Sequence, residues 1–138
     1  MNVGAGSEGQ GPGAEGQGGT AEDGTRRIAL WIAAARPKTL LLSLAPALAG
    51  IGLAAAQTGG LASATALATL LAAVAIQVGT NLHNDAVDFE RGTDTADRVG
   101  PPRATAQGWF SARQVRAAAH LAFGLAFLLG LLLVIRGG

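Results

Sequence analysis

Long apolar stretches alternate with short polar ones along most of the chain. Three stretches carry almost no charge and cover residues 39–56, 61–83 and 115–135. At 1.5 Å of rise per helical residue, each is long enough to cross a hydrocarbon core about 30 Å thick. The pattern therefore predicts an all-α membrane protein with three transmembrane helices.

The composition supports a membrane protein and excludes other classes. Of the 138 residues, 49% are hydrophobic and only 14% are charged, which is too apolar for an ordinary soluble domain. A net charge of +1 argues against a nucleic-acid-binding surface. There is no cysteine, so disulfides and thiolate chemistry are both excluded.

The start of the chain has a different composition. Residues 1–27 are rich in Gly and polar residues and have few large apolar ones, so they bury too little surface to order themselves. They also lack the basic start and apolar middle of a signal peptide. We expect a disordered tail at residues 1–27 and one membrane domain at residues 28–138.

Several residues mark helix ends. Pro37 is tolerated near a helix start, so the first span begins close to it. Gly92 and the run Gly100-Pro101-Pro102 interrupt a helical pattern. Ser111-Ala-Arg-Gln114 fits a capping box that opens a new helix. A polar loop is thus expected at residues 84–110, between the second and third spans.

The residues that follow the second span concentrate acidic and amide side chains. Residues 81–98 hold five of the nine acidic residues of the chain. If the helix continues, Asn81, Asn84 and Asp88 share one face, and Asp85 lies about 100° around from Asn84. Carboxylate and amide oxygens suit Mg²⁺, which accepts one or two protein carboxylates beside substrate phosphates. The stretch predicts half of a site for Mg²⁺ and a diphosphate.

A longer motif covers these residues. It reads Asn84-Asp85-x-x-Asp88-x-x-x-Gly92-x-Asp94, followed by Asp97-Arg98-x-Gly100-Pro101-x-Arg103. It resembles the first aspartate-rich motif of the UbiA superfamily of membrane aromatic prenyltransferases. The Gly-x-Asp extension and the Asp-Arg-x-Gly-Pro tail are most similar to the branch that prenylates 1,4-dihydroxy-2-naphthoate in menaquinone synthesis.

The resemblance implies Mg²⁺-dependent transfer of a polyprenyl group from its diphosphate to an aromatic acceptor, 1,4-dihydroxy-2-naphthoate, giving demethylmenaquinone. It implies metal ligation by Asn84, Asp85 and Asp88, catalysis by Asp85, Asp88 and Asp94, and diphosphate binding by Lys38, Asn81, Arg98 and Arg103. Complete members of the family have about nine membrane helices and a second aspartate-rich motif. We therefore expect this chain to be the N-terminal part of such a bundle and incomplete as a catalyst.

The same residues permit other interpretations. Arg36 and Lys38 suit topology anchors in the headgroup region as well as the rim of a cavity. A run of mixed charge is also typical of a solvated loop, and His120 of an interface or packing residue. A cation-binding or transport component and a noncatalytic helical subunit remain alternatives. A transporter would place charges within its spans, whereas the acidic residues here cluster at one end.

Charge also predicts orientation. Basic residues precede the first span and lie between the second and third, whereas the turn between the first two spans has no charge. By the positive-inside rule, the N-terminus and the acidic loop face the cytoplasm at the inner (plasma) membrane. The expected partners are the polyprenyl diphosphate, the aromatic acceptor and the lipid bilayer, with no nucleic acid.

Overall fold

A computed structural model describes residues 18–93 and 100–137. Within them the chain forms four helices and no strand: α1 (Gly18–Ala35), α2 (Pro37–Thr58), α3 (Ser63–Glu90) and α4 (Ala112–Gly137). By length and composition, α2, α3 and α4 can each cross a membrane. The predicted all-α membrane fold with three spanning helices is confirmed.

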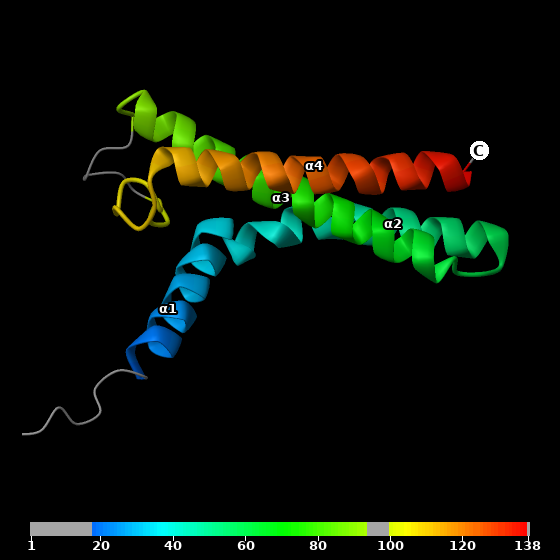
Figure 1. Ribbon diagram of the computed structural model, residues 1–138. Helices are drawn as coiled ribbons and strands as arrows, with labels where there is room; N and C mark the ends of the chain where they lie inside the picture. Colours follow the sequence, from blue (N-terminus) through cyan, green and yellow to red (C-terminus); the bar gives the residue numbers. More distant parts are fainter. Residues whose placement is uncertain (1–17, 94–99, 138) are drawn as a thin grey trace, which may run out of the picture.

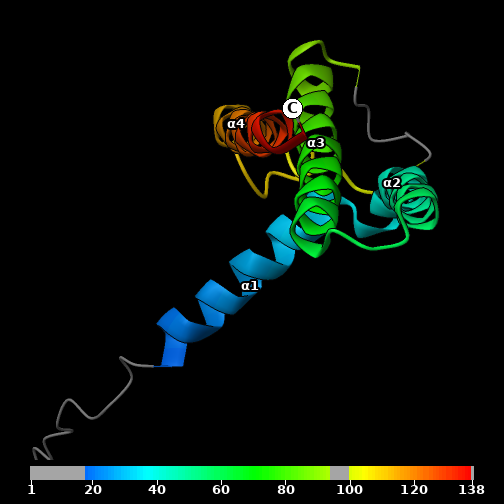
Figure 2. The ribbon, with the colours of Figure 1, turned by 90° about the vertical axis from the view of Figure 1, so that its right-hand side faces the viewer.

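The third helix, α3, is the centre of the arrangement. It packs against α4 over much of its length and against α2 on another side (Figures 1 and 2). Both neighbours run antiparallel to it. The first helix, α1, meets the end of the bundle at a steep angle and points away from it (Figure 1). The C-terminal end of α3 therefore lies near the start of α2 and the start of α4.

The end of α3 differs from the prediction. The helix continues beyond residue 83 to Glu90, so the first residues of the expected loop are helical. Gly92, with φ of 67°, then stops it in the left-handed conformation. The Gly92 N–H donates to the carbonyl of Phe89 and the Thr93 N–H to that of Asp88, each at 3.1 Å. This pattern is a Schellman motif, and it satisfies carbonyls that a helix end leaves open.

The first helix, α1, was not predicted from the sequence. Residues 18–27, expected to be disordered, belong to α1, whereas residues 1–17 lie outside the described part of the chain. Extending an existing helix avoids the cost of nucleation, so the apolar helical turns at residues 28–35 can be extended into the polar residues before them. Arg36, with φ of 56°, forms the corner to α2, and Pro37 opens α2 as predicted.

The fourth helix begins with the predicted capping box. The Gln114 N–H donates to Ser111 Oγ at 3.3 Å, and the Ser111 N–H donates to Gln114 Oε1 at 2.9 Å. Each side chain thus satisfies a backbone donor of the other residue.

The largest packed cluster of buried residues lies at one end of the molecule, whereas Ala68, Ala72, Ala75 and Ala126 are buried further along α3 and α4. The cluster joins α1, the second half of α3, the segment before α4 and the start of α4, through Ala34, Leu82, Ala86, Ala104, Phe110, Val115 and Ala119. Trp31 of α1 stacks on Phe110, with ring centroids 3.9 Å apart. Many apolar side chains elsewhere on the three long helices are exposed, as expected of surfaces that face lipid or other helices.

Candidate functional site

The polar cluster is built at the C-terminal end of α3, where the segment before α4 folds back against the helix. Asp85 is its most buried member, with 1% of its surface exposed. Its Oδ2 accepts from the Ala104 N–H at 2.7 Å, and its Oδ1 accepts from the Thr105 N–H at 3.2 Å and from the Thr105 hydroxyl. Both carboxylate oxygens are therefore bound by the chain itself.

One turn further along α3, Asp88 pairs with Arg103. The Arg103 guanidinium donates to Asp88 Oδ2 at 2.5 Å. The Arg103 side chain is buried at 7% exposure, whereas the Asp88 side chain keeps 33% of its surface exposed. Asp88 thus presents an accessible carboxylate next to a fixed positive charge.

Asn81 lies one turn before Asp85 and points to a different segment. Its Nδ2 donates to the carbonyl of Ala35 and to Thr39 Oγ1, both at 2.8 Å, and its Oδ1 accepts from Gln77 at 3.2 Å. Asn81 was expected to bind diphosphate. In the structure its amide holds the corner between α1 and α2, and Asn81 is 7% exposed.

The remaining predicted residues fall in three places. Asn84 is exposed on α3, and Lys38 is exposed at the start of α2. Asp94 and Arg98 lie outside the described residues. His120, expected to be an interface or packing residue, is exposed on α4, and its ring centroid lies 6.5 Å from that of His83.

The four predicted site residues described on α3 thus form two adjoining rows. Asn81 and Asp85 are four residues apart and buried, and both bind other segments of the chain. Asn84 and Asp88 are also four residues apart, which makes them neighbours on the helix surface, and both are accessible. The sequence pattern grouped three of these residues on one face, but it did not separate the buried row from the open one.

The donor set decides which residues can accept a divalent cation. In the described part of the chain, no three His, Cys, Asp or Glu side chains come together as a metal site. A Mg²⁺ ion bound with substrate phosphates needs only one or two protein carboxylates. Asn84 and Asp88 offer accessible hard oxygens and fit that requirement. Asp85, also predicted as a ligand, is only 1% exposed, and both its oxygens accept hydrogen bonds from residues 104 and 105.

Two partners of the motif were not anticipated. The Thr105 hydroxyl binds Asp85, and the Thr39 hydroxyl accepts from Asn81. A threonine gives no signal of this role in a single sequence. The backbone amide of Ala104 gives none at all, because its direction depends on the path of the loop.

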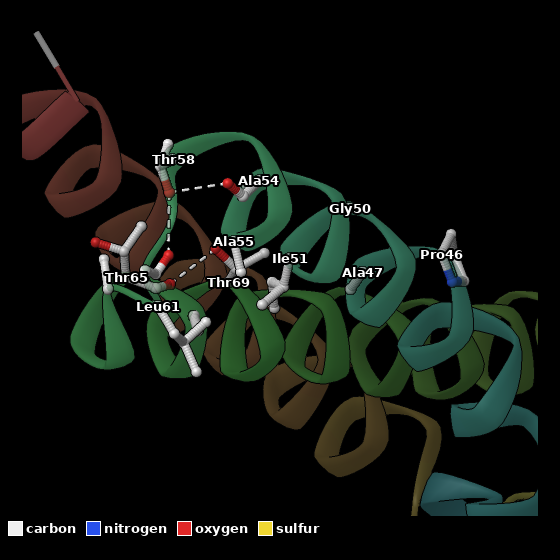
Figure 3. A pocket seen from close by; sticks show the side chains of 13 residues that line it. Pro46, Ala47, Gly50, Ile51, Ala54, Ala55, Thr58, Leu61, Thr65 and Thr69 are labelled. Atoms are coloured by element: carbon white, nitrogen blue, oxygen red, sulfur yellow. Dashed lines mark hydrogen bonds between the residues drawn. The ribbon is translucent and has the colours of Figure 1, made fainter.

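A groove at the other end of the molecule is chemically different. It lies between α2 and the start of α3, has a volume of about 390 Å³ and is lined mainly by small and apolar residues from Pro46 to Thr69 (Figure 3). The Thr58 hydroxyl there donates to the carbonyl of Ala54 at 2.9 Å. Thr69 precedes Asp85 by roughly 24 Å of helix at 1.5 Å per residue, so the groove is separate from the polar cluster.

The chain is similar to known proteins. A family model described as the UbiA prenyltransferase family matches residues 43–136. The chain is 42% identical over 107 residues to a 1,4-dihydroxy-2-naphthoate octaprenyltransferase of Mycobacterium tuberculosis, an alignment that covers 78% of this chain and 36% of that relative. It is 36% identical over 108 residues to the Escherichia coli protein of the same name, covering 78% of this chain and 35% of the relative. No solved structure matched the chain.

The matches cover most of this chain but only part of each relative. The chain spans about a third of the length of the curated relatives it matches. The family model nevertheless covers more than half of the chain and includes α3, with its polar rows, and α4. The chain belongs to the UbiA prenyltransferase family.

Proposed function

We propose that this chain provides one wall of a prenyltransferase site that transfers a polyprenyl group from its diphosphate to an aromatic acceptor, 1,4-dihydroxy-2-naphthoate. The names of the relatives support the acceptor and the prenyl donor. The observation that carries the proposal is the pairing of Asp88 with Arg103 beside the exposed Asn84. It offers oxygen ligands for a cation and a positive charge for a diphosphate at one place.

In this proposal Asn84 and Asp88 are the ligands of Mg²⁺. The bound ion would neutralise diphosphate oxygens and so stabilise the leaving group. Arg103 adds a fixed positive charge, and Lys38 and Arg98 are further candidates for the diphosphate. Asp94 is proposed as an additional acidic group of the same site.

The reaction is a substitution at carbon. The bond between C1 of the prenyl chain and the diphosphate oxygen breaks, and its electron pair leaves with the diphosphate. A ring carbon of the acceptor forms the new bond to C1 with a pair of π electrons. When the new bond forms at the carbon that bears the carboxylate, the ring regains aromaticity by losing that carboxylate as CO₂, which yields the hydroquinone form, demethylmenaquinol; the quinone forms only on later oxidation. Exclusion of water by an apolar bundle would favour capture by the ring over hydrolysis.

The membrane arrangement follows from charge. We propose that the polar end of α3 faces the cytoplasm at the inner membrane. Arg113 and Arg116 open α4 near this end and Lys38 lies in the first turn of α2, whereas the connection between α2 and α3 is uncharged. Prenyl diphosphates would then reach the cluster from the cytoplasmic side.

The test replaces the matching segment of the Mycobacterium tuberculosis relative by residues 28–136 of this chain and measures prenyl transfer in membranes with Mg²⁺. Asp88→Asn should lower the rate by about 10²-fold or more, because it removes a ligand charge at the leaving group. Glu90→Gln is the matched control, since Glu90 is exposed on the same turn and pairs with Arg116. Equal rates for Asp88→Asn and Glu90→Gln in an active chimera would refute the assignment of Asp88.

A further inference from the structure

We propose that Asp85 is a positioning residue and not a metal ligand: together with Thr105 it forms a clip that fixes the backbone at residues 103–105 and so holds Arg103 beside Asp88. This inference deepens the proposed function and rests on it for the meaning of Arg103. The clip itself requires neither metal nor substrate.

Both oxygens of the Asp85 carboxylate accept hydrogen bonds within the clip. Two backbone amides and one hydroxyl donate to its two oxygens, at 2.7 Å from Ala104 and 3.2 Å from the Thr105 amide. The Thr105 hydroxyl also lies 3.2 Å from the Asp85 carbonyl. The side chains are almost inaccessible, with Asp85 at 1% and Thr105 at 4% exposure. Asp85 thus has almost no open surface for a cation, and a cation that displaced these donors would leave them buried without a partner.

The clip determines where Arg103 lies. Residue 103 precedes the two clipped amides directly, so binding of Ala104 and Thr105 to α3 brings the Arg103 backbone against the same helix. Asp88 lies three residues after Asp85, on the next turn of the same side of the helix. Arg103 then reaches Asp88 at 2.5 Å. Fixing the backbone lowers the entropy lost when a long arginine side chain is ordered.

The neighbouring buried residue has a parallel role. Asn81 binds the corner between α1 and α2, as Asp85 binds residues 104 and 105. Both belong to the buried row, and both join α3 to a segment distant in the sequence. This end of α3 therefore carries one row that assembles the site and one row that faces the ligand.

Two measurements on the full chain in detergent, with EDTA present, test the clip. The first is hydrogen–deuterium exchange of the peptide amides at residues 100–110. Asp85→Asn and Thr105→Val should each raise exchange at residues 104 and 105 by about tenfold or more, because each removes acceptors or donors that keep the segment closed. Thr105→Ser, which keeps the hydroxyl, and Asn84→Ala, in the open row, should exchange like the wild type.

The second measurement reads Arg103 itself, by mass spectrometry after modification with phenylglyoxal. Thr105→Val should raise the modification rate of Arg103 several-fold, as Asp88→Asn should, although the change at residue 105 leaves both Arg103 and Asp88 intact. Thr105→Ser should restore the wild-type rate. Circular dichroism verifies that each variant keeps its helicity. If Asp85→Asn does not fold, the comparison of Thr105→Val with Thr105→Ser tests the clip.

Two results would overturn the inference. One is wild-type exchange at residues 104 and 105 in folded Asp85→Asn or Thr105→Val. The other is increased exchange in Thr105→Val with an unchanged modification rate at Arg103, which would mean that the clip holds the backbone without positioning the side chain. Neither measurement uses metal, prenyl diphosphate or turnover, so failure of the proposed function leaves both results interpretable.

Discussion

The two ends of α3 are stabilised by different kinds of contact. At the C-terminal end, Asn81 and Asp85 are buried and bind segments far away in the sequence. At the N-terminal end, only small side chains such as Ala68 and Ala72 are buried, the Thr69 hydroxyl donates to a carbonyl of its own helix, and Leu67 and Leu71 stay 58% and 48% exposed. The polar end is thus held together within the chain, whereas the apolar end presents its surface to whatever surrounds it.

The difference follows from the solvent. In a bilayer, apolar side chains gain little by meeting one another, because lipid tails are equally apolar. A buried polar group has no such freedom, since leaving it without a hydrogen bond costs several kcal/mol by most estimates. The geometry of the polar cluster is therefore set by contacts within the chain, and the packing of the apolar end depends on its neighbours.

The largest difference in unfolding free energy between the two ends is expected on replacing a phenylalanine. Phe110→Ala removes a ring that is 6% exposed and stacks on Trp31. We expect a loss of about 3–5 kcal/mol in the free energy of unfolding, as for other buried Phe→Ala changes. Phe127→Ala is the matched control, because Phe127 is 71% exposed on α4. Equilibrium unfolding in mixed detergent micelles measures both, and equal losses would contradict the placement of the largest buried cluster at the polar end.

A second test separates the two rows of α3. Asn81→Ala leaves the Gln77 side chain, the Ala35 carbonyl and the Thr39 hydroxyl without their partner. The expected loss of stability is roughly 1–3 kcal/mol. Asn84→Ala, one turn away and exposed, should change stability by less than about 0.5 kcal/mol while lowering prenyl transfer in the chimera. A stability loss for Asn84→Ala as large as that for Asn81→Ala would contradict the division into rows.

The helical part of this picture could be predicted from the sequence. Apolar length alone predicts α2, α3 and α4, and local signals predict Pro37 at the start of α2 and the capping box at Ser111. These features depend on residues close together in the sequence, so a single chain contains the information. α1 was not predicted, because its polar first turns have no apolar periodicity of their own.

The site could be predicted only in part. The spacing of Asn84 and Asp88 predicts that they are neighbours on a helix, and they are neighbours on α3. Asp85 was grouped with them as a ligand, since helical spacing does not reveal which side another segment covers. That information comes from residues 103–105, whose approach to α3 depends on backbone amides that no side-chain pattern encodes.

Between the two ends, a glycine controls how closely α3 and α4 approach. A Cβ at Gly79 would lie 2.8 Å from carbons of the Phe123 ring, so the ring must shift to accept it. We expect Gly79→Ala to cost about 1 kcal/mol relative to Gly124→Ala, the low end for overpacking, since a side chain can move. Gly124 is the matched control on α4, because a Cβ added there would meet nothing within 4 Å. Thermal unfolding of both variants in the same detergent measures the difference, and a Gly79→Ala variant at least as stable as Gly124→Ala would contradict the close approach.

The smallest effect is expected where the polar end meets water. Glu90 pairs with Arg116, and the two side chains are 47% and 38% exposed. Glu90→Gln should change the free energy of unfolding by less than about 1 kcal/mol, because solvent screens the pair and ordering two long side chains offsets its attraction. The difference should shrink further in 1 M salt, where the screening length is about 3 Å. A loss of unfolding free energy as large as that of Asn81→Ala, or one that persists in high salt, would mean that the exposed ion pair stabilises this end as much as the buried residues do. A small, salt-sensitive loss means that the buried contacts, and not the exposed charges, stabilise the polar end of α3.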